Sequence, residues 1–203
     1  MRARMALSKA EIACRLREVV LRDKPAEMLT ASPKGTVPVI VQSDGTVIEE
    51  SLDVMNWALA QHDPDRWLEP DIGTREDMNA LIAIFDGPFK RALDRYKYPN
   101  RYSSENIVRE DQRRIGAQHL ADLDTRLATQ TYLFGERVSL ADIAIFPFVR
   151  QFANTDRAWF DAQPLPHLQR WLETHLTSLL FTGIMAKYPQ WKTGDPEIAF
   201  PPA

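Results

Sequence analysis

The change of pattern near residue 62 constrains the fold more than any other feature of these 203 residues. Before it, short apolar runs alternate with turn signals such as Ser32-Pro33-Lys34-Gly35 and Ser43-Asp44-Gly45, which is typical of strands joined by tight turns. After about residue 72, apolar residues recur at helical spacing and no segment has the alternation of a strand. The sequence therefore predicts a small α/β part followed by an all-helical part.

These patterns divide the chain into four stretches. They are an α/β module over 1–62, a linker over 63–72, an all-helical domain over 73–188, and an irregular tail over 189–203 that contains four prolines. Within the module we expect a helix over 2–9, strands over 12–21, 37–41 and 46–48, and a helix from Glu50. In the helical domain we expect helices over 73–96 and 104–129 and from Ser139 and Pro166.

Composition excludes several classes of partner. The 25 basic and 28 acidic residues are interspersed and give a net charge of −3, which argues against nucleic acid or an anionic membrane as the main partner. No apolar run approaches the roughly 18 residues of a membrane-spanning helix. With one cysteine, Cys14, and no secretory signal pattern, the expected location is the cytoplasm.

Two neighbouring features suggest a site for an extended ligand. Val37-Pro38 opens a strand, and a cis bond there would turn the N–H and C=O of Val37 outward, where a peptide could pair with them. Glu50-Ser51 lies where a strand gives way to a helix, so free N–H groups and the Ser51 hydroxyl would favour a carboxylate. The plainer alternatives are a trans proline at a sheet edge, and Ser51 as a helix cap with Glu50 complementing the helix dipole.

The other residues that could carry chemistry are interpreted as structural residues or as unconnected ones. Ser139-Leu140-Ala141-Asp142 has the spacing of a capping box, which is a folding device and not a catalytic pair. The four histidines have no spacing that pairs them as ligands, so we expect no metal. Cys14 falls in an early strand, where a small structural residue is expected in preference to a reactive thiol.

The combination of Ser32-to-Ile40, Asp44-Gly45 and Ile48-to-Ser51 with a helical half carrying the Ser139-to-Asp142 box resembles cytosolic glutathione transferases over essentially the whole chain. Leu21-to-Pro25 and Lys187-to-Trp191 further resemble the cysteine-type omega and related bacterial classes. The resemblance implies a thioredoxin-like N-terminal module joined to an all-α C-terminal domain, glutathione as co-substrate without metal, and a homodimer.

The resemblance also implies a role for each contact with glutathione. The backbone of Val37 would face the cysteinyl part, with Pro38 cis, and Lys24 would face the glycine carboxylate. Glu50 would take the γ-glutamyl ammonium, and Ser51 with its helix N-terminus the γ-glutamyl carboxylate. Lys34 and Asp53 are interpreted as solvated charges. Phe85 and Phe89 are candidates for lining a second, small-molecule substrate site, and core packing accounts for them equally well.

The sequence departs from the family at its start. In relatives a first strand and a turn carrying the catalytic cysteine precede residues that match Met1-Arg2-Ala3-Arg4, so the expected nucleophile lies about four positions before Met1 and the module is incomplete. Three outcomes are open: the natural protein starts upstream, the 12–20 strand shifts inward, or another chain fills the slot. Two functions remain, a transferase for thiol transfer or conjugation, and a non-catalytic glutathione-binding or protein-interaction module.

Overall fold

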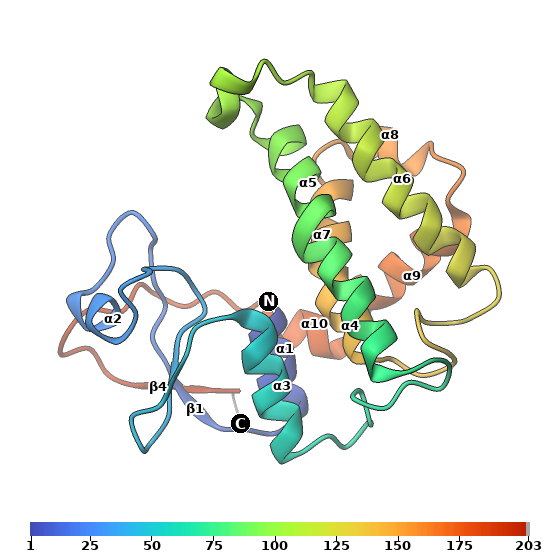
Figure 1. Ribbon diagram of the computed structural model, residues 1–203. Coiled ribbons are helices and arrows are strands. Elements are labelled where there is room, and N and C mark those ends of the chain that lie inside the picture. Colours follow the sequence, from blue (N-terminus) through green and yellow to red (C-terminus); the bar gives the residue numbers. More distant parts are fainter. Residues whose placement is uncertain (202–203) are drawn as a thin grey trace. The chain divides into compact units, whose positions relative to one another are not determined.

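The computed structural model describes residues 1–201, which form two compact units (Figure 1). The first unit comprises Met1–Pro64 and the chain from Leu179 onward, and it contains all four strands of the described residues. The second unit, Asp65–Ser178, is helical. The predicted α/β and all-helical halves are therefore present, while the chain after Leu179 lies with the first unit and not with the helical domain.

The strands of the first unit form two separate antiparallel pairs. β1, Cys14–Leu16, pairs with β4, Ile198–Phe200, and β2, Ile40–Val41, pairs with β3, Val47–Ile48. No ladder joins the two pairs within residues 1–201. Both predicted long strands are shorter than expected: beyond Leu16 the chain makes only isolated bridges, and Val37 to Val39 precede β2 without pairing.

The tail predicted to be irregular contains β4, which corrects that expectation. Phe200 is only 1% exposed, and Trp191 is buried and donates its N–H to the carbonyl of Glu18 at 2.9 Å. Burial of these two large rings favours an ordered path across a proline-rich stretch, because apolar area removed from water stabilises the fold irrespective of local propensity. β1 thereby has a partner that the sequence patterns did not indicate.

Four helices complete the first unit. They are α1 (Arg2–Lys9), α2 (Ala26–Ala31), α3 (Ser51–Gln61) and α10 (Leu179–Ile184). α1 packs against α3 and α10, and Ala6 and Ala58 are fully buried at small positions of α1 and α3. Small side chains let two helices approach closely, and Met5 and Met55 fill the space beside them.

The second unit is built from helices of which two begin with capping boxes, at Thr74 and at Ser139. The elements are α4 (Arg75–Ile84), a π-helical turn (Phe85–Phe89), α5 (Lys90–Lys97), a 3₁₀ segment (Pro99–Glu105), α6 (Arg109–Leu127), α7 (Leu140–Ala153), α8 (Arg157–Asp161) and α9 (Pro166–Thr177). The helix predicted over 73–96 is thus interrupted at Pro88, which cannot donate an i→i−4 hydrogen bond. α6 starts five residues later than predicted.

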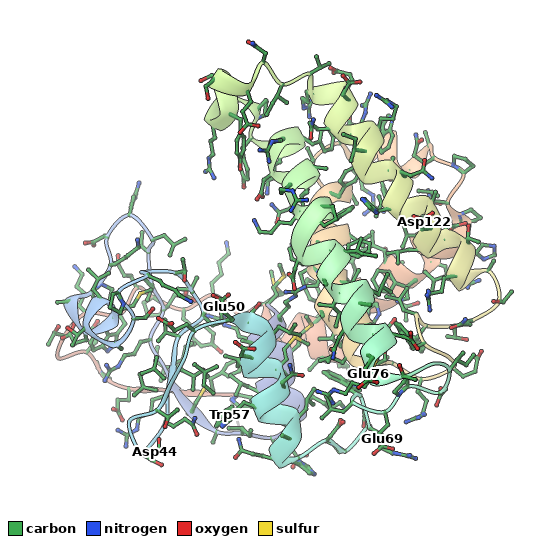
Figure 2. All side chains as sticks on the ribbon, viewed as in Figure 1. Asp44, Glu50, Trp57, Glu69, Glu76 and Asp122 are labelled. Atoms are coloured by element: carbon green, nitrogen blue, oxygen red, sulfur yellow. The ribbon has the colours of Figure 1, made fainter. Side chains whose placement is uncertain are left out.

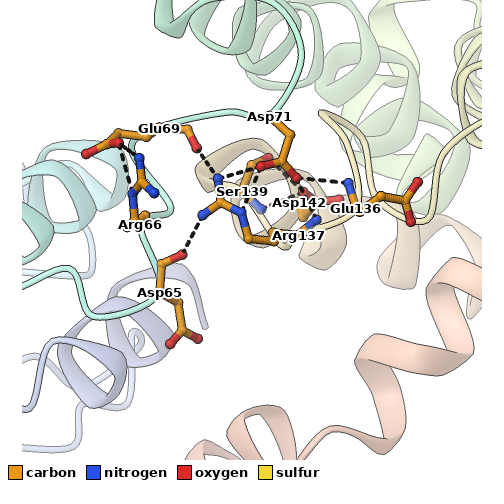
Figure 3. A network of polar contacts seen from close by, with 8 residues as sticks. All are labelled: Asp65, Arg66, Glu69, Asp71, Glu136, Arg137, Ser139 and Asp142. Atoms are coloured by element: carbon orange, nitrogen blue, oxygen red, sulfur yellow. Dashed lines mark hydrogen bonds and ion pairs between the residues drawn. The ribbon is translucent and has the colours of Figure 1, made fainter.

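The stretch predicted as a linker is held within the second unit (Figure 3). The carboxylate of Asp71 accepts hydrogen bonds from the backbone N–H of Glu136 and of Arg137, at 3.0 Å each, and from Nε of Arg137 at 2.7 Å. Trp67 is buried, and its carbonyl accepts from the N–H of Leu140 at 2.8 Å. The sequence patterns predicted a linker here, and these long-range bonds hold that segment to the second unit.

No helix in the described part of the chain is both long and apolar enough to cross a membrane.

Replacing Gly116 with alanine should destabilise the second unit. Gly116 lies on α6 beneath Phe152 of α7, and a Cβ at this position would fall 2.3 Å from the Phe152 ring. Overpacking costs about 1–3 kcal/mol, which outweighs the gain of up to about 1 kcal/mol from removing a helical glycine. Urea unfolding should show a net loss of about 1–2 kcal/mol.

The control is Gly183→Ala on α10, where the added Cβ would meet no atom of the described residues within 4 Å. Here only the helix propensity changes, so stability should stay the same or rise by up to about 1 kcal/mol. If both variants shift stability in the same direction, the close packing of α6 on Phe152 is not what constrains residue 116.

Candidate functional site

The Val37–Pro38 peptide bond is cis, the conformation that the family resemblance implies. The side chain of Val37 is 51% exposed, and its N–H and C=O form no hydrogen bond within residues 1–201. Backbone groups left unpaired at the surface can pair with an extended ligand, as an added strand would. The plainer alternative of a trans proline is wrong.

The start of α3 is open to an anion. Glu50 is the N-cap residue in an extended conformation (Figure 2), and Ser51 is the first helical residue. No side chain among the described residues caps this helix. The first N–H that bonds within the helix is that of Val54, which donates to the carbonyl of Glu50 at 3.0 Å. The preceding N–H groups and the positive end of the helix dipole therefore remain available. Ser51 is not the cap, so that part of the plainer alternative is wrong.

A buried arginine adds positive charge at this position. Arg2 is 8% exposed, and its Nη1 lies 3.5 Å from Oγ of Ser51. An arginine, a serine hydroxyl and a free helix N-terminus favour a carboxylate. Sequence patterns did not single out Arg2, because in a short helix an arginine is normally a surface residue and its approach to Ser51 spans 49 residues.

The carboxylate of Glu50 is not free. Nζ of Lys34 lies 3.1 Å from Oε1 of Glu50 and 3.4 Å from Oε2 of Glu49. The hydrogen bond to Glu50 raises the pKa of Lys34, and one from the buried hydroxyl of Ser32 lowers the pKa of Glu49. Lys34, expected as a solvated charge, is therefore paired with both glutamates, and a ligand ammonium would share Glu50 with it.

Lys24 lies over the turn that leads to Val37. Gly35 has a φ of 60°, and a Cβ on it would fall 3.1 Å from Nζ of Lys24. Glycine at this position thus permits both the left-handed backbone and the approach of the lysine. No carboxylate pairs with Lys24 in the part of the chain that the structure describes, so its ammonium is available to a ligand anion.

Cys14 is poorly suited to act as a nucleophile. It lies on β1, half-buried, and desolvation by burial raises the pKa of its thiol, against the opposing influence of Arg4. A raised thiol pKa disfavours the thiolate, the nucleophilic form. These features agree with the interpretation of Cys14 as a structural residue.

Phe85 and Phe89 are core residues of the second unit. Both are at most 1% exposed, their ring centres are 4.6 Å apart, and Phe89 lies 5.6 Å from Phe152. Neither ring offers surface to a substrate in this arrangement, which is what core packing predicts. The proposal that they line a second-substrate site has no support from their burial.

Among residues 1–201, no three His, Cys, Asp or Glu side chains gather as the ligands of a metal ion would.

The capping box predicted at Ser139 is confirmed and extends further than local sequence indicates. Asp142 accepts from the N–H and the hydroxyl of Ser139, at 2.8 and 2.7 Å, and also from the N–H of Leu133 and from Nε1 of Trp171, at 2.9 and 2.8 Å. The carboxylate is fully buried and all its partners are donors within the second unit. This arrangement holds the fold together and has no access to a ligand.

Comparison with known families matches both units. Residues 1–67 match the family described as "Glutathione S-transferase, N-terminal domain", and residues 106–174 match "Glutathione S-transferase, C-terminal domain". Together the two matches cover about two thirds of the chain, in the order that the family has.

Individual relatives are distant. The chain is 27% identical to Glutathione S-transferase 4 of Zea mays over 187 residues, which covers 84% of this chain and 79% of that protein. It is 24% identical over 172 residues to Elongation factor 1-gamma of Rattus norvegicus, covering 81% of this chain but only 37% of that protein's length. A crystal structure of a glutathione transferase family member from Pseudomonas fluorescens with two glutathione bound has a TM-score of 0.75 at 16% identity, covering 89% of this chain and 85% of that one. At 16% identity, this similarity shows a shared fold and says nothing further about activity.

Proposed function

The chain has the N- and C-terminal domains of the glutathione S-transferase family, and from this premise we propose that its first unit binds glutathione. The observation that carries the proposal is the uncapped start of α3, where Ser51 and the free N–H groups would hold the γ-glutamyl carboxylate. A tripeptide with a carboxylate at each end and an ammonium beside one of them needs three charged contacts. The first unit supplies residues of each required kind.

The remaining contacts follow from the surroundings of each residue. The unpaired backbone of Val37, the residue that precedes the cis bond to Pro38, would pair with the cysteinyl part of the ligand. Glu50 would accept the γ-glutamyl ammonium while it keeps Lys34 as a neighbour. The unpaired ammonium of Lys24 would face the glycine carboxylate.

We propose that the full catalytic function is glutathione-dependent thiol transfer or conjugation to a small electrophile, and that the protein acts as a cytoplasmic homodimer.

One observation favours a second candidate function, a glutathione-binding or protein-interaction module without catalysis. Cys14 is the only cysteine of the sequence, and its thiol pKa is raised by burial. The curated relatives include elongation factor subunits alongside transferases, which supports keeping both candidates.

Removing the side chain that would hold either carboxylate of glutathione, Ser51 or Lys24, should weaken glutathione binding. Loss of a charge-assisted hydrogen bond costs about 1.5–3 kcal/mol, so calorimetric titration should show a dissociation constant raised roughly ten- to a hundredfold in Ser51→Ala and in Lys24→Ala. Arg157→Ala on α8 removes one positive charge in the second unit, where the arginine is paired with Asp161. This control should bind as the unchanged protein does.

Unchanged affinity in both site variants would refute the proposed site. Turnover then separates the two candidate functions. An activated aryl halide tests conjugation, and a mixed disulfide of glutathione tests thiol transfer. Binding with turnover of either probe identifies an enzyme, and binding without turnover of both identifies the non-catalytic module.

A further inference from the structure

One end of the second unit is strongly basic although the whole chain carries a net charge of −3. Residues 90–114 run from α5 through the 3₁₀ segment into α6 and include eight basic and four acidic residues, a local excess of four positive charges. The basic residues are Lys90, Arg91, Arg95, Lys97, Arg101, Arg109, Arg113 and Arg114. The rest of the chain is correspondingly acidic, so the positive charge is concentrated here.

Most of the acidic residues in this stretch are already neutralised within it. Asp94 pairs with Lys90, Asp111 pairs with Arg114 at 2.9 Å, and Glu105 takes two hydrogen bonds from Arg95, at 2.8 and 3.0 Å. Four basic residues, in contrast, have no carboxylate partner within residues 1–201; they are Arg91, Lys97, Arg101 and Arg109. Of these, Arg91 and Arg101 are exposed, and Lys97 and Arg109 are half-buried.

Two of these unpaired cations share one aromatic ring. Nζ of Lys97 lies 4.9 Å and the guanidinium carbon of Arg101 lies 4.1 Å from the ring centre of Tyr98. The N–H of Arg101 donates to the carbonyl of Tyr98 at 2.9 Å, which keeps the turn closed. Two like charges held beside one ring repel each other, and a bound anion would relieve that repulsion. We call Lys97, Tyr98 and Arg101 the Tyr98 cluster.

The same stretch of the chain contains a second pair of a cation and a ring. The guanidinium of Arg95 lies 4.6 Å from the ring centre of Tyr102 while it binds Glu105. An arginine stacked on a ring loses little freedom when it forms a further bond, because its planar group is already oriented and its N–H donors point outward in the plane. The stretch thus offers preordered donors that match carboxylates.

We propose that the Tyr98 cluster is a docking site for an acidic polypeptide segment, that is, a partner protein with neighbouring Asp or Glu residues in an exposed stretch. Carboxylates fit the planar donors of Arg101 and the point charge of Lys97, and excess positive charge would steer such a partner to this end of the unit. Single-stranded nucleic acid fits less well, since base stacking needs a free aromatic face and cations lie over the rings of both Tyr98 and Tyr102.

The test is fluorescence anisotropy with a labelled deca-glutamate peptide at about 50 mM salt, where exposed charges are only weakly screened. The unchanged protein should bind the peptide, and affinity should fall as salt rises. The double variant Lys97→Gln/Arg101→Gln should bind roughly tenfold more weakly, because it removes both cations of the Tyr98 cluster that would pair with the peptide carboxylates.

The control is Arg66→Gln/Arg157→Gln, which removes the same number of charges from two arginines of the second unit that already pair with Glu69 and Asp161. Its affinity should stay close to that of the unchanged protein. The proposal is overturned if the unchanged protein does not bind the peptide or if the control loses as much affinity as the cluster variant. It is also overturned if a labelled single-stranded RNA of ten nucleotides binds more tightly than the peptide. Glutathione binding is not involved in any of these readouts.

Discussion

Replacing Asp142 with alanine is expected to lower the free energy of unfolding of the second unit by about 3–5 kcal/mol. The carboxylate is fully buried and accepts four hydrogen bonds, from Ser139 twice, from Leu133 and from Trp171. Alanine would leave these donors without an acceptor in a site that water does not reach, and each buried unsatisfied group carries a desolvation penalty. Urea unfolding followed by tryptophan fluorescence and by circular dichroism measures the loss.

Asp77 provides a matched control, because it occupies the same position in the capping box of α4. Its carboxylate accepts from the N–H and hydroxyl of Thr74, at 2.8 and 2.9 Å, but it does so at the surface. Asp77→Ala should therefore cost only about 1 kcal/mol, the usual contribution of an exposed cap. Equal losses in the two variants would mean that the buried contacts of Asp142 add nothing to its role as a cap.

The two capping boxes also illustrate which features could be predicted from sequence. The box at Ser139 was predicted because its bonds join residues three positions apart, so that local spacing specifies them. The bond from Trp171 to the same carboxylate joins residues 29 apart and depends on how α9 packs against α7. The local sequence pattern therefore predicted the capping box. The burial of Asp142, which determines how much the box contributes to the free energy of unfolding, depends on tertiary packing and was not predicted.

The predicted boundaries of the strands and of the tail were wrong because they too depend on tertiary packing. The prolines of residues 189–203 indicated an irregular tail, and Pro189 and Pro196 do lie outside helices and strands. β4 nevertheless forms at Ile198–Phe200, because pairing with β1 and burial of Phe200 are long-range effects that no window of sequence contains. The cis bond at Val37–Pro38, in contrast, was implied by the family resemblance and is present in the structure.

In the candidate site, too, some features could be predicted from local sequence and others depend on long-range contacts. The turn, the start of α3 and the positions of Ser51 and Lys24 follow from local signals together with the resemblance. The pairing of Lys34 with Glu49 and Glu50, and the approach of Arg2 to Ser51, connect segments 15 to 49 residues apart. Charged side chains look alike in sequence whether they are solvated or paired, so their partners could not be predicted.

His175 makes stability depend on pH. The residue is 5% exposed, and its ring centre lies 4.7 Å from that of Trp171 and 5.2 Å from that of Phe146. Within residues 1–201 its Nε2 has no hydrogen-bond partner. Burial lowers the pKa of His175 below the ordinary value of 6.5, against an opposing effect of the Asp142 carboxylate. In the unfolded chain the ring takes up a proton as pH falls through about 6.5, while in the folded protein it stays neutral to lower pH.

The unfolded state therefore binds more protons than the folded state below pH 6.5, and the stability due to neutral His175 is present above that pH and lost as pH falls. Between pH 6.5 and 5 the free energy of unfolding should drop by up to about 1.4 kcal/mol per pH unit from this group alone. Urea unfolding at pH 7.5, 6.5, 5.5 and 5.0 measures the slope. His175→Gln should be less stable at pH 7.5 but have a flatter slope, whereas the control variant His167→Gln, at a half-buried position of the same helix, should keep the original slope. If the slope survives in His175→Gln, another group controls the acid sensitivity, and the buried histidine is only a packing residue.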